Sequence, residues 1–162
     1  MHLAVDQSTG HIRAAATTAN SISDGQMLPG LLEQGERVIG QVSVDGGYER
    51  RACYGAIAWR GARAAIPPRR RARIWQHGNS KAERLARDEN LRRIRAVGRA
   101  RWKQELGCHR RSLAETAMFR PKTICGGALR ARSEAAQGAG TMLLLNALNR
   151  MTALGMPSAY SL

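Results

Sequence analysis

The sequence predicts a mixed α/β fold in which helices cover the faces of a sheet. Three observations support this fold class. Short segments typical of strands alternate with segments of helical period, and turn residues separate them. Hydrophobic residues make up 43% of the 162 residues, which suits one folded domain. Aromatic residues make up only 4%, so we expect a core of mainly aliphatic side chains.

The first half of the chain predicts the strands. Residues 1–6 and 11–18 each predict a strand, because residues 6–10 between them have the composition of a hairpin turn. Ser23 is expected to cap a short helix that runs through Leu32. The elements expected next are a buried strand at 37–44, a helix at 51–60 and a strand at 64–66.

The second half of the chain predicts helices. Leu91, Ile94 and Val97 recur at helical spacing from Glu83 onward, and residues 109–118 continue as helix. The remaining expectations are a mobile loop at 77–80, a flexible stretch at 135–140 and an amphipathic helix at 141–154 that Gly155 and Pro157 end.

The charge of the chain points to a polyanionic partner. The net charge is +14, and the basic segment at residues 69–111 holds 15 Lys and Arg against four acidic residues. Such an imbalance attracts nucleic acid and contributes nothing to the fold. The three cysteines show no Cys-x-x-C spacing, and no apolar run is long enough to span a bilayer. We therefore expect a cytoplasmic protein that binds nucleic acid and no membrane.

Two carboxylates are candidates for chemistry. Asp45 ends the strand expected at 37–44, where open α/β sheets place ligand groups, although a turn aspartate before Gly-Gly is the commoner role. Glu115 lies four residues after Arg111 and seven before Lys122, so one helix face would carry all three. The ordinary interpretation of that face is a solvated Arg–Glu pair. The alternative is a metal-binding carboxylate among phosphate-binding cations.

A family resemblance favours the alternative. The stretches VDGGYERRACYGAIAWRGARAAIPPRR, GRARWKQELGCHRRSLAETAMFRPK and LNRMTALGMP resemble the C-terminal part of bacterial insertion-sequence DDE transposases, in the group numbered five, which shares the transposase domain of the group numbered four. The family signature Tyr-x2-Arg-x3-Glu-x6-Lys corresponds here to Cys108, Arg111, Glu115 and Lys122. The resemblance implies a ribonuclease-H-like mixed sheet with flanking helices, lacking its first strand. It also implies Asp45 and Glu115 as catalytic ligands of Mg²⁺ or Mn²⁺.

The chain departs from the family pattern at several positions. Cys108 replaces the tyrosine of the signature, and Glu49 stands where relatives commonly have aspartate. Pro121 removes one helix hydrogen bond, which can turn Lys122 away from the face of Glu115. In members of the family, the first catalytic aspartate precedes the segment that corresponds to residues 2–9 of this chain. Asp6 is expected to be a turn residue first and a metal ligand a distant second.

The resemblance and the charge together predict DNA transposition. We expect residues 1–162 to form the C-terminal part of a DDE catalytic domain for metal-dependent phosphodiester cleavage and strand transfer, in the bacterial cytoplasm near the nucleoid. The fragment alone is expected to bind double-stranded DNA at insertion-sequence ends and targets without cutting it, with a second copy or an upstream transposase fragment as partner. Two alternatives are a catalytically inactive DNA-binding remnant that regulates transposition and an RNA-binding protein. The residues expected to contact DNA are Arg111, Lys122, Arg69, Arg70, Arg71, Arg73 and Arg110.

Overall fold

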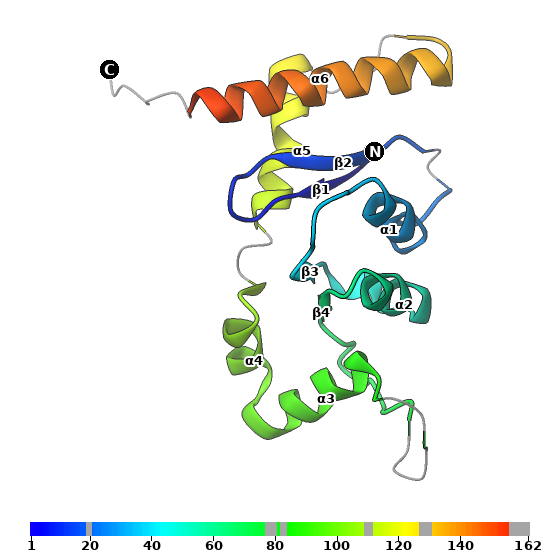
Figure 1. Cartoon of the computed structure of the whole chain (residues 1–162), viewed down its shortest axis with the longest axis vertical. Coiled ribbons are helices and arrows are strands. Elements are labelled where there is room, and N and C mark those ends of the chain that lie inside the picture. The colour runs from blue at the N-terminus through cyan, green and yellow to red at the C-terminus, as the bar shows by residue number, and fades with distance from the viewer. Residues whose placement is uncertain (19–20, 77–80, 82–83, 109–111, 127–130, 156–162) are drawn as a thin grey trace. The chain divides into compact units, whose positions relative to one another are not determined.

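The protein divides into two compact units, each described by itself (Figure 1). The hairpin unit contains Met1–Ala19 and Ser112–Leu162, and the sheet unit contains Asn20–Arg111. The structure is a computed structural model. It describes residues 1–18, 21–76, 81, 84–108, 112–126 and 131–155.

The hairpin unit packs a β-hairpin against two helices. Strands β1 (His2–Val5) and β2 (Ile12–Ala16) are antiparallel, with His2 opposite Ala16. The expected hairpin is thereby confirmed. Helices α5 (Ser112–Cys125) and α6 (Glu134–Leu154) supply the rest of the unit. Its buried core consists of Ile12, Ala15, Ala117, Leu145 and Leu148.

Asp6 organises the turn between β1 and β2. Its Oδ1 accepts hydrogen bonds from the backbone N–H and the hydroxyl of Ser8, at 2.9 and 2.6 Å, and from the N–H of Thr9 at 3.2 Å. Its Oδ2 pairs with Arg13 at 2.9 Å. These bonds confirm the expected turn role. They hold the pKa of Asp6 well below its usual range against the opposing effect of partial burial, and the bond from the Ser8 hydroxyl has the largest effect.

The two helices of this unit are longer than expected. Residues 135–140 belong to α6, so the expectation of a flexible stretch there is wrong. The Ser133 hydroxyl accepts from the N–H of Ala136 at 3.3 Å and caps the helix before its glycines. Helix α5 continues through Pro121 to Cys125, so the proline does not end the helix between Glu115 and Lys122.

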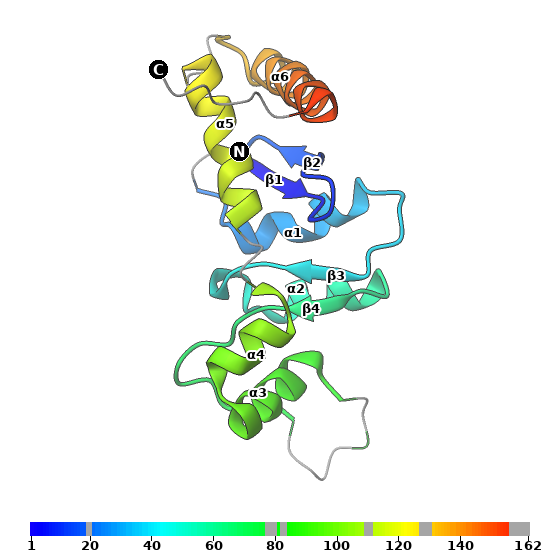
Figure 2. The ribbon, with the colours of Figure 1, turned by 90° about the vertical axis from the view of Figure 1, so that its left-hand side faces the viewer.

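The sheet unit is built around two parallel strands. Strand β3 (Gln41–Ser43) pairs with β4 (Arg63–Ala65) in the register Ser43 opposite Ala65, and Figure 2 shows the two strands side by side. The other elements are α1 (Asp24–Glu33), the 3₁₀ turn η1 (Gly46–Tyr48), α2 (Arg51–Trp59), α3 (Ala86–Val97) and α4 (Arg99–Glu105).

Side-chain alternation along β4 gives the sheet unit its layers. Ala64 and Ile66 face α1 and α2, where they pack with Leu28, Leu32, Cys53, Tyr54 and Ile57. Ala65 points to the opposite face and packs with Trp102 and Leu106. The two-stranded sheet is therefore covered by helices on both faces.

At the contact between α1 and α2, a proline leaves a carbonyl of α1 without its usual helical hydrogen bond. Pro29 lies inside α1 and cannot donate a hydrogen bond to the carbonyl of Gly25, four residues earlier. The buried thiol of Cys53 donates to that carbonyl instead, at 3.2 Å. A side chain at position 25 would approach Arg50 within 3.1 Å, so glycine permits this close approach of the helices.

The architecture confirms a mixed α/β fold, with one difference in its strands. Among the residues described, six α-helices accompany four strands, and these strands form two separate two-stranded sheets. The strand expected at 37–44 is shorter and only partly buried, and Val38 is 98% exposed. None of the helices in the described ranges is long and apolar enough to cross a membrane.

Candidate functional site

The candidate site lies at the carboxyl edge of β3 and β4. Because the strands are parallel, the chain leaves both at the same edge. The two exits touch each other. The N–H of Val44 donates to the carbonyl of Ala65 at 3.4 Å, and a Cβ atom on Gly46 would lie 3.2 Å from the carbonyl of Pro67. Asp45 therefore leaves the sheet beside the start of the basic segment.

Asp45 caps the turn η1. Its Oδ1 accepts from the N–H of Gly47 at 2.8 Å, and its side chain is exposed. This bond fixes the carboxylate at the edge of the sheet. The adjacent Tyr48 has its pKa raised to about 12, first by burial and then by the carboxylates of Asp24 and Asp45. The phenol therefore stays protonated at neutral pH.

Four arginines follow β4 on a segment without helix or strand. We call residues 69–73 the arginine segment; the side chains of Arg69, Arg70, Arg71 and Arg73 are all exposed. Within the described part of the chain, no acidic side chain lies within salt-bridge distance of Arg70, Arg71 or Arg73. Their guanidinium groups are therefore available to a phosphate backbone.

A buried ionic cluster lies beneath this segment. Arg87 donates from Nε to Glu49 at 2.8 Å and from Nη1 to Asp88 at 3.1 Å. All three side chains are at most 4% exposed. Glu49 also accepts from the N–H of Arg69 at 2.9 Å, so it joins the cluster to the start of the arginine segment.

The other expected site residues belong to different places. Glu115 and Lys122 are exposed on α5 of the hairpin unit. Asp45 belongs to the sheet unit, so neither unit by itself contains both carboxylates. Cys108 packs against the cluster around Trp102. Arg110 and Arg111 lie outside the described residues.

The exposed carboxylate of Asp45 fits one position in the shell of a hard divalent ion. Within the part of the chain that the structure describes, no three His, Cys, Asp or Glu side chains are grouped closely enough to hold a metal ion. The described residues therefore form no complete metal site around Asp45.

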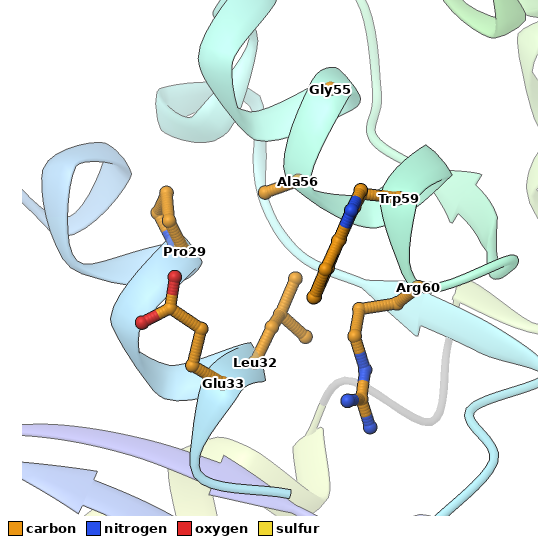
Figure 3. A pocket seen from close by; sticks show the side chains of 7 residues that line it. All are labelled: Pro29, Leu32, Glu33, Gly55, Ala56, Trp59 and Arg60. Atoms are coloured by element: carbon orange, nitrogen blue, oxygen red, sulfur yellow. The ribbon is translucent and has the colours of Figure 1, made fainter.

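An apolar hollow between α1 and α2 is a weaker candidate (Figure 3). It has a volume of about 250 Å³, and Trp59 projects beside it with 79% of its surface exposed. The guanidinium of Arg60 at its rim already donates to the carbonyls of Gly35 and Arg37. Glu33 is the acidic residue in its lining, and the other lining residues include no His, Cys, Asp or second Glu to share acid–base or metal chemistry with it.

Sequence reasoning predicted Asp45 and the arginines as site residues but did not identify the side chains that hold this part of the chain. Arg87 and Asp88 lie in the first turn of α3 and show no local sign of a buried pair, and Glu49 stood out only as a departure from the family pattern. Glu49 and Arg87 are separated by 38 positions, so no local pattern could have paired them.

Comparison with known proteins gives one family match. The model of a family described as a transposase DDE domain matches residues 1–150, which is most of the chain. No solved structure matches the chain.

Proposed function

The chain belongs to the transposase DDE domain family, and from this premise we propose that it acts in the transposition of a bacterial insertion sequence of the group numbered five. Family membership implies nuclease or transposase activity, DNA binding and a ribonuclease-H-like fold. The observation that carries the proposal is the juxtaposition of Asp45 with the arginine segment at one sheet edge. A reacting phosphodiester needs an anionic metal ligand and cations for its backbone at one place.

We propose Asp45 and Glu115 as catalytic carboxylates that hold Mg²⁺ or Mn²⁺. Members of this family use divalent metals, and both side chains are exposed. A divalent ion bound there would activate the attacking oxygen and stabilise the leaving oxygen on phosphorus. Asp45 is suited to this role because its bond to Gly47 engages one carboxylate oxygen and fixes the orientation of the other.

The cations would hold the DNA in register. Arg70, Arg71 and Arg73 can form forked hydrogen bonds to phosphate oxygens. Lys122 shares the exposed face of α5 with Glu115, because seven residues return to nearly the same side of a helix. Arg69, Arg110 and Arg111 complete the proposed contacts to double-stranded DNA at insertion-sequence ends and targets.

The third carboxylate is proposed to come from elsewhere. In members of the family, it precedes the segment that corresponds to residues 2–9 of this chain. Asp6 is held in the hairpin turn by its bonds to Ser8 and Arg13. We therefore propose that residues 1–162 act as the C-terminal part of the catalytic domain. A further segment of transposase, or a second copy of the chain, would complete it.

Substitution of Glu115 tests the catalytic role. Glu115→Ala, in the chain supplemented with the segment that carries the first aspartate, should abolish metal-dependent nicking of a labelled duplex end. DNA affinity should remain equal or rise slightly, because a negative charge near phosphate is removed. The control Glu105→Ala removes an acid that pairs with Arg93, and it should retain nicking. Nicking by Glu115→Ala at near the unaltered rate would contradict the role.

The same assay distinguishes the alternatives. Tight DNA binding without nicking under any supplementation would favour the catalytically inactive regulator. Stronger binding to an RNA duplex than to a DNA end of equal length would favour the RNA-binding protein. Chelation of the divalent ion should stop nicking and leave the affinity of the arginine segment for DNA intact.

A further inference from the structure

The buried cluster of Glu49, Arg87 and Asp88 has no part in the chemistry proposed above. It places one cation and two carboxylates in the interior of the sheet unit, with Asp88 fully buried. Removing such charges from water costs several kcal/mol per ion, and ion pairing returns that cost only when the geometry is good. A buried ionic cluster is therefore weak evidence of stability, and its role follows from the groups that it contacts.

What the cluster arranges is the backbone of residues 69–76. Glu49 accepts from the N–H of Arg69 at 2.9 Å, and Arg87 donates to the carbonyl of Arg73 at 2.7 Å. Asp88 accepts from the N–H groups of Trp75 and Gln76, at 3.0 and 2.8 Å. Both ends of the arginine segment are thus fixed to the buried charges, while its four arginine side chains remain exposed.

Two further contacts hold the same stretch of chain. The guanidinium of Arg87 lies 3.8 Å from the centre of the Trp75 ring, a favourable stacking distance. Arg99, at the start of α4, donates to the carbonyl of Pro68 at 2.8 Å. A segment with no helix or strand of its own is therefore held at each end by groups from other elements.

We propose that Glu49, Arg87 and Asp88 are positioning residues that hold the arginine segment as a fixed phosphate-binding edge beside Asp45. The proposal rests on the proposed DNA-binding function. A free loop would have to be ordered when it binds DNA, and this ordering costs conformational entropy. The cluster orders the segment when the protein folds, so the backbone that carries the arginines is already fixed when DNA binds.

The charge of the variants separates this proposal from simple electrostatics. Glu49→Gln raises the net charge by one unit, which by charge alone should tighten DNA binding. Glu49 accepts from Arg87 with one carboxylate oxygen and from Arg69 with the other. A glutamine replaces one of these oxygens by an NH2 group, which only donates, so one of the two bonds is lost and the proposal predicts weaker binding. We expect the Kd for a duplex DNA, measured by fluorescence anisotropy, to rise about tenfold.

The surface residue Glu105 provides the matched control. Glu105→Gln makes the same change in charge at a carboxylate that pairs with Arg93 at 2.7 Å and touches no part of the arginine segment. Its Kd should be unchanged or lower. Equal effects of Glu49→Gln and Glu105→Gln on the Kd would overturn the proposal.

A double-mutant cycle separates positioning from general destabilisation. In a chain whose Arg69, Arg70, Arg71 and Arg73 are replaced by glutamine, the added Glu49→Gln should have almost no effect on the Kd, because nothing remains to be positioned. An undiminished tenfold effect in that background would overturn the proposal. If the four-arginine variant itself binds DNA as tightly as the unaltered chain, the proposed DNA-binding role of the segment fails instead.

Thermal unfolding of each variant accompanies the binding measurements. Should Glu49→Gln fail to fold, Asp88→Asn carries the same test, since it weakens the hold on Trp75 and Gln76 and leaves Glu49 in place. Failure of both variants to fold would overturn the proposal, because the cluster would then maintain the whole sheet unit and not the segment.

Discussion

At the scale of single residues, Asn149 closes the outer edge of the hairpin. Its side-chain amide accepts from the N–H of Ile12 at 2.7 Å and donates to the carbonyl of Ile12 at 2.8 Å, as a neighbouring strand would. Asn149→Ala leaves both backbone groups without these partners and should lower the free energy of unfolding by about 1–3 kcal/mol. Denaturant unfolding measures this loss.

Asn146 on the same helix serves as the control for that prediction. Its side chain is exposed, so Asn146→Ala should change the free energy of unfolding by less than about 0.5 kcal/mol. Equal losses in the two variants would show that Asn149 contributes only through its helix propensity.

Asp6 gives the hairpin a dependence on acid pH. Its pKa is lowered from an ordinary value near 3.8, so the unfolded chain takes up the proton first as the pH falls. The stability that Asp6 contributes is therefore complete above about pH 5 and is lost progressively below about pH 4. Asp6→Asn should flatten the fall in unfolding free energy over that range.

Ser8→Ala supports the same prediction, because the Ser8 hydroxyl is the largest cause of the lowered pKa. In this variant, the fall in unfolding free energy below about pH 4 should be partly reduced. Denaturant unfolding at several pH values measures both effects. If the unfolding free energy falls as steeply at low pH in Asp6→Asn as in the unaltered chain, the loss of stability is due to other carboxylates.

At the scale of elements, the arginine segment should dominate DNA affinity. If about seven cations of the basic segment meet phosphates, log K should fall with log salt at a slope of about −6. Replacing Arg69, Arg70, Arg71 and Arg73 by glutamine should bring the slope to about −3 with little change in stability, since these side chains are exposed. An unchanged slope would place the DNA-binding surface elsewhere.

Local sequence signals predicted most elements well. Turn composition around Asp6 gave the hairpin, and Ser23 marked the start of α1 at Asp24. The glycines at 138 and 140 predicted flexibility because glycine disfavours helix, yet α6 includes them between the cap at Ser133 and the buried Thr141. Tertiary packing overrode a local preference there.

Contacts between distant residues could not be predicted from the sequence. The thiol of Cys53 that bonds to Gly25, and the pairing of Glu49 with Arg87, join side chains far apart in the chain. Hydrophobic period and turn composition carry no information on such pairs. The sequence therefore indicated which groups could bind DNA, whereas the structure was needed to find what holds them.

At the scale of the whole molecule, Asp45, proposed as a metal ligand, and the arginines proposed to bind phosphate lie at one edge of a parallel sheet. The family match over residues 1–150 supports the chemistry, and the contact of Gly46 with Pro67 supports the juxtaposition. Glu115 and a further carboxylate are proposed to complete the site. The 162-residue chain alone should therefore bind DNA without cutting it.

Metal-dependent nicking by Asp45→Ala tests the central claim most directly. The unaltered chain and the variant, each supplemented with the segment that carries the first aspartate, would be incubated with a labelled duplex end of the insertion sequence and Mg²⁺ or Mn²⁺. We predict that Asp45→Ala loses nicking while its DNA affinity stays equal or becomes slightly tighter. Nicking by Asp45→Ala at near the unaltered rate would contradict the account.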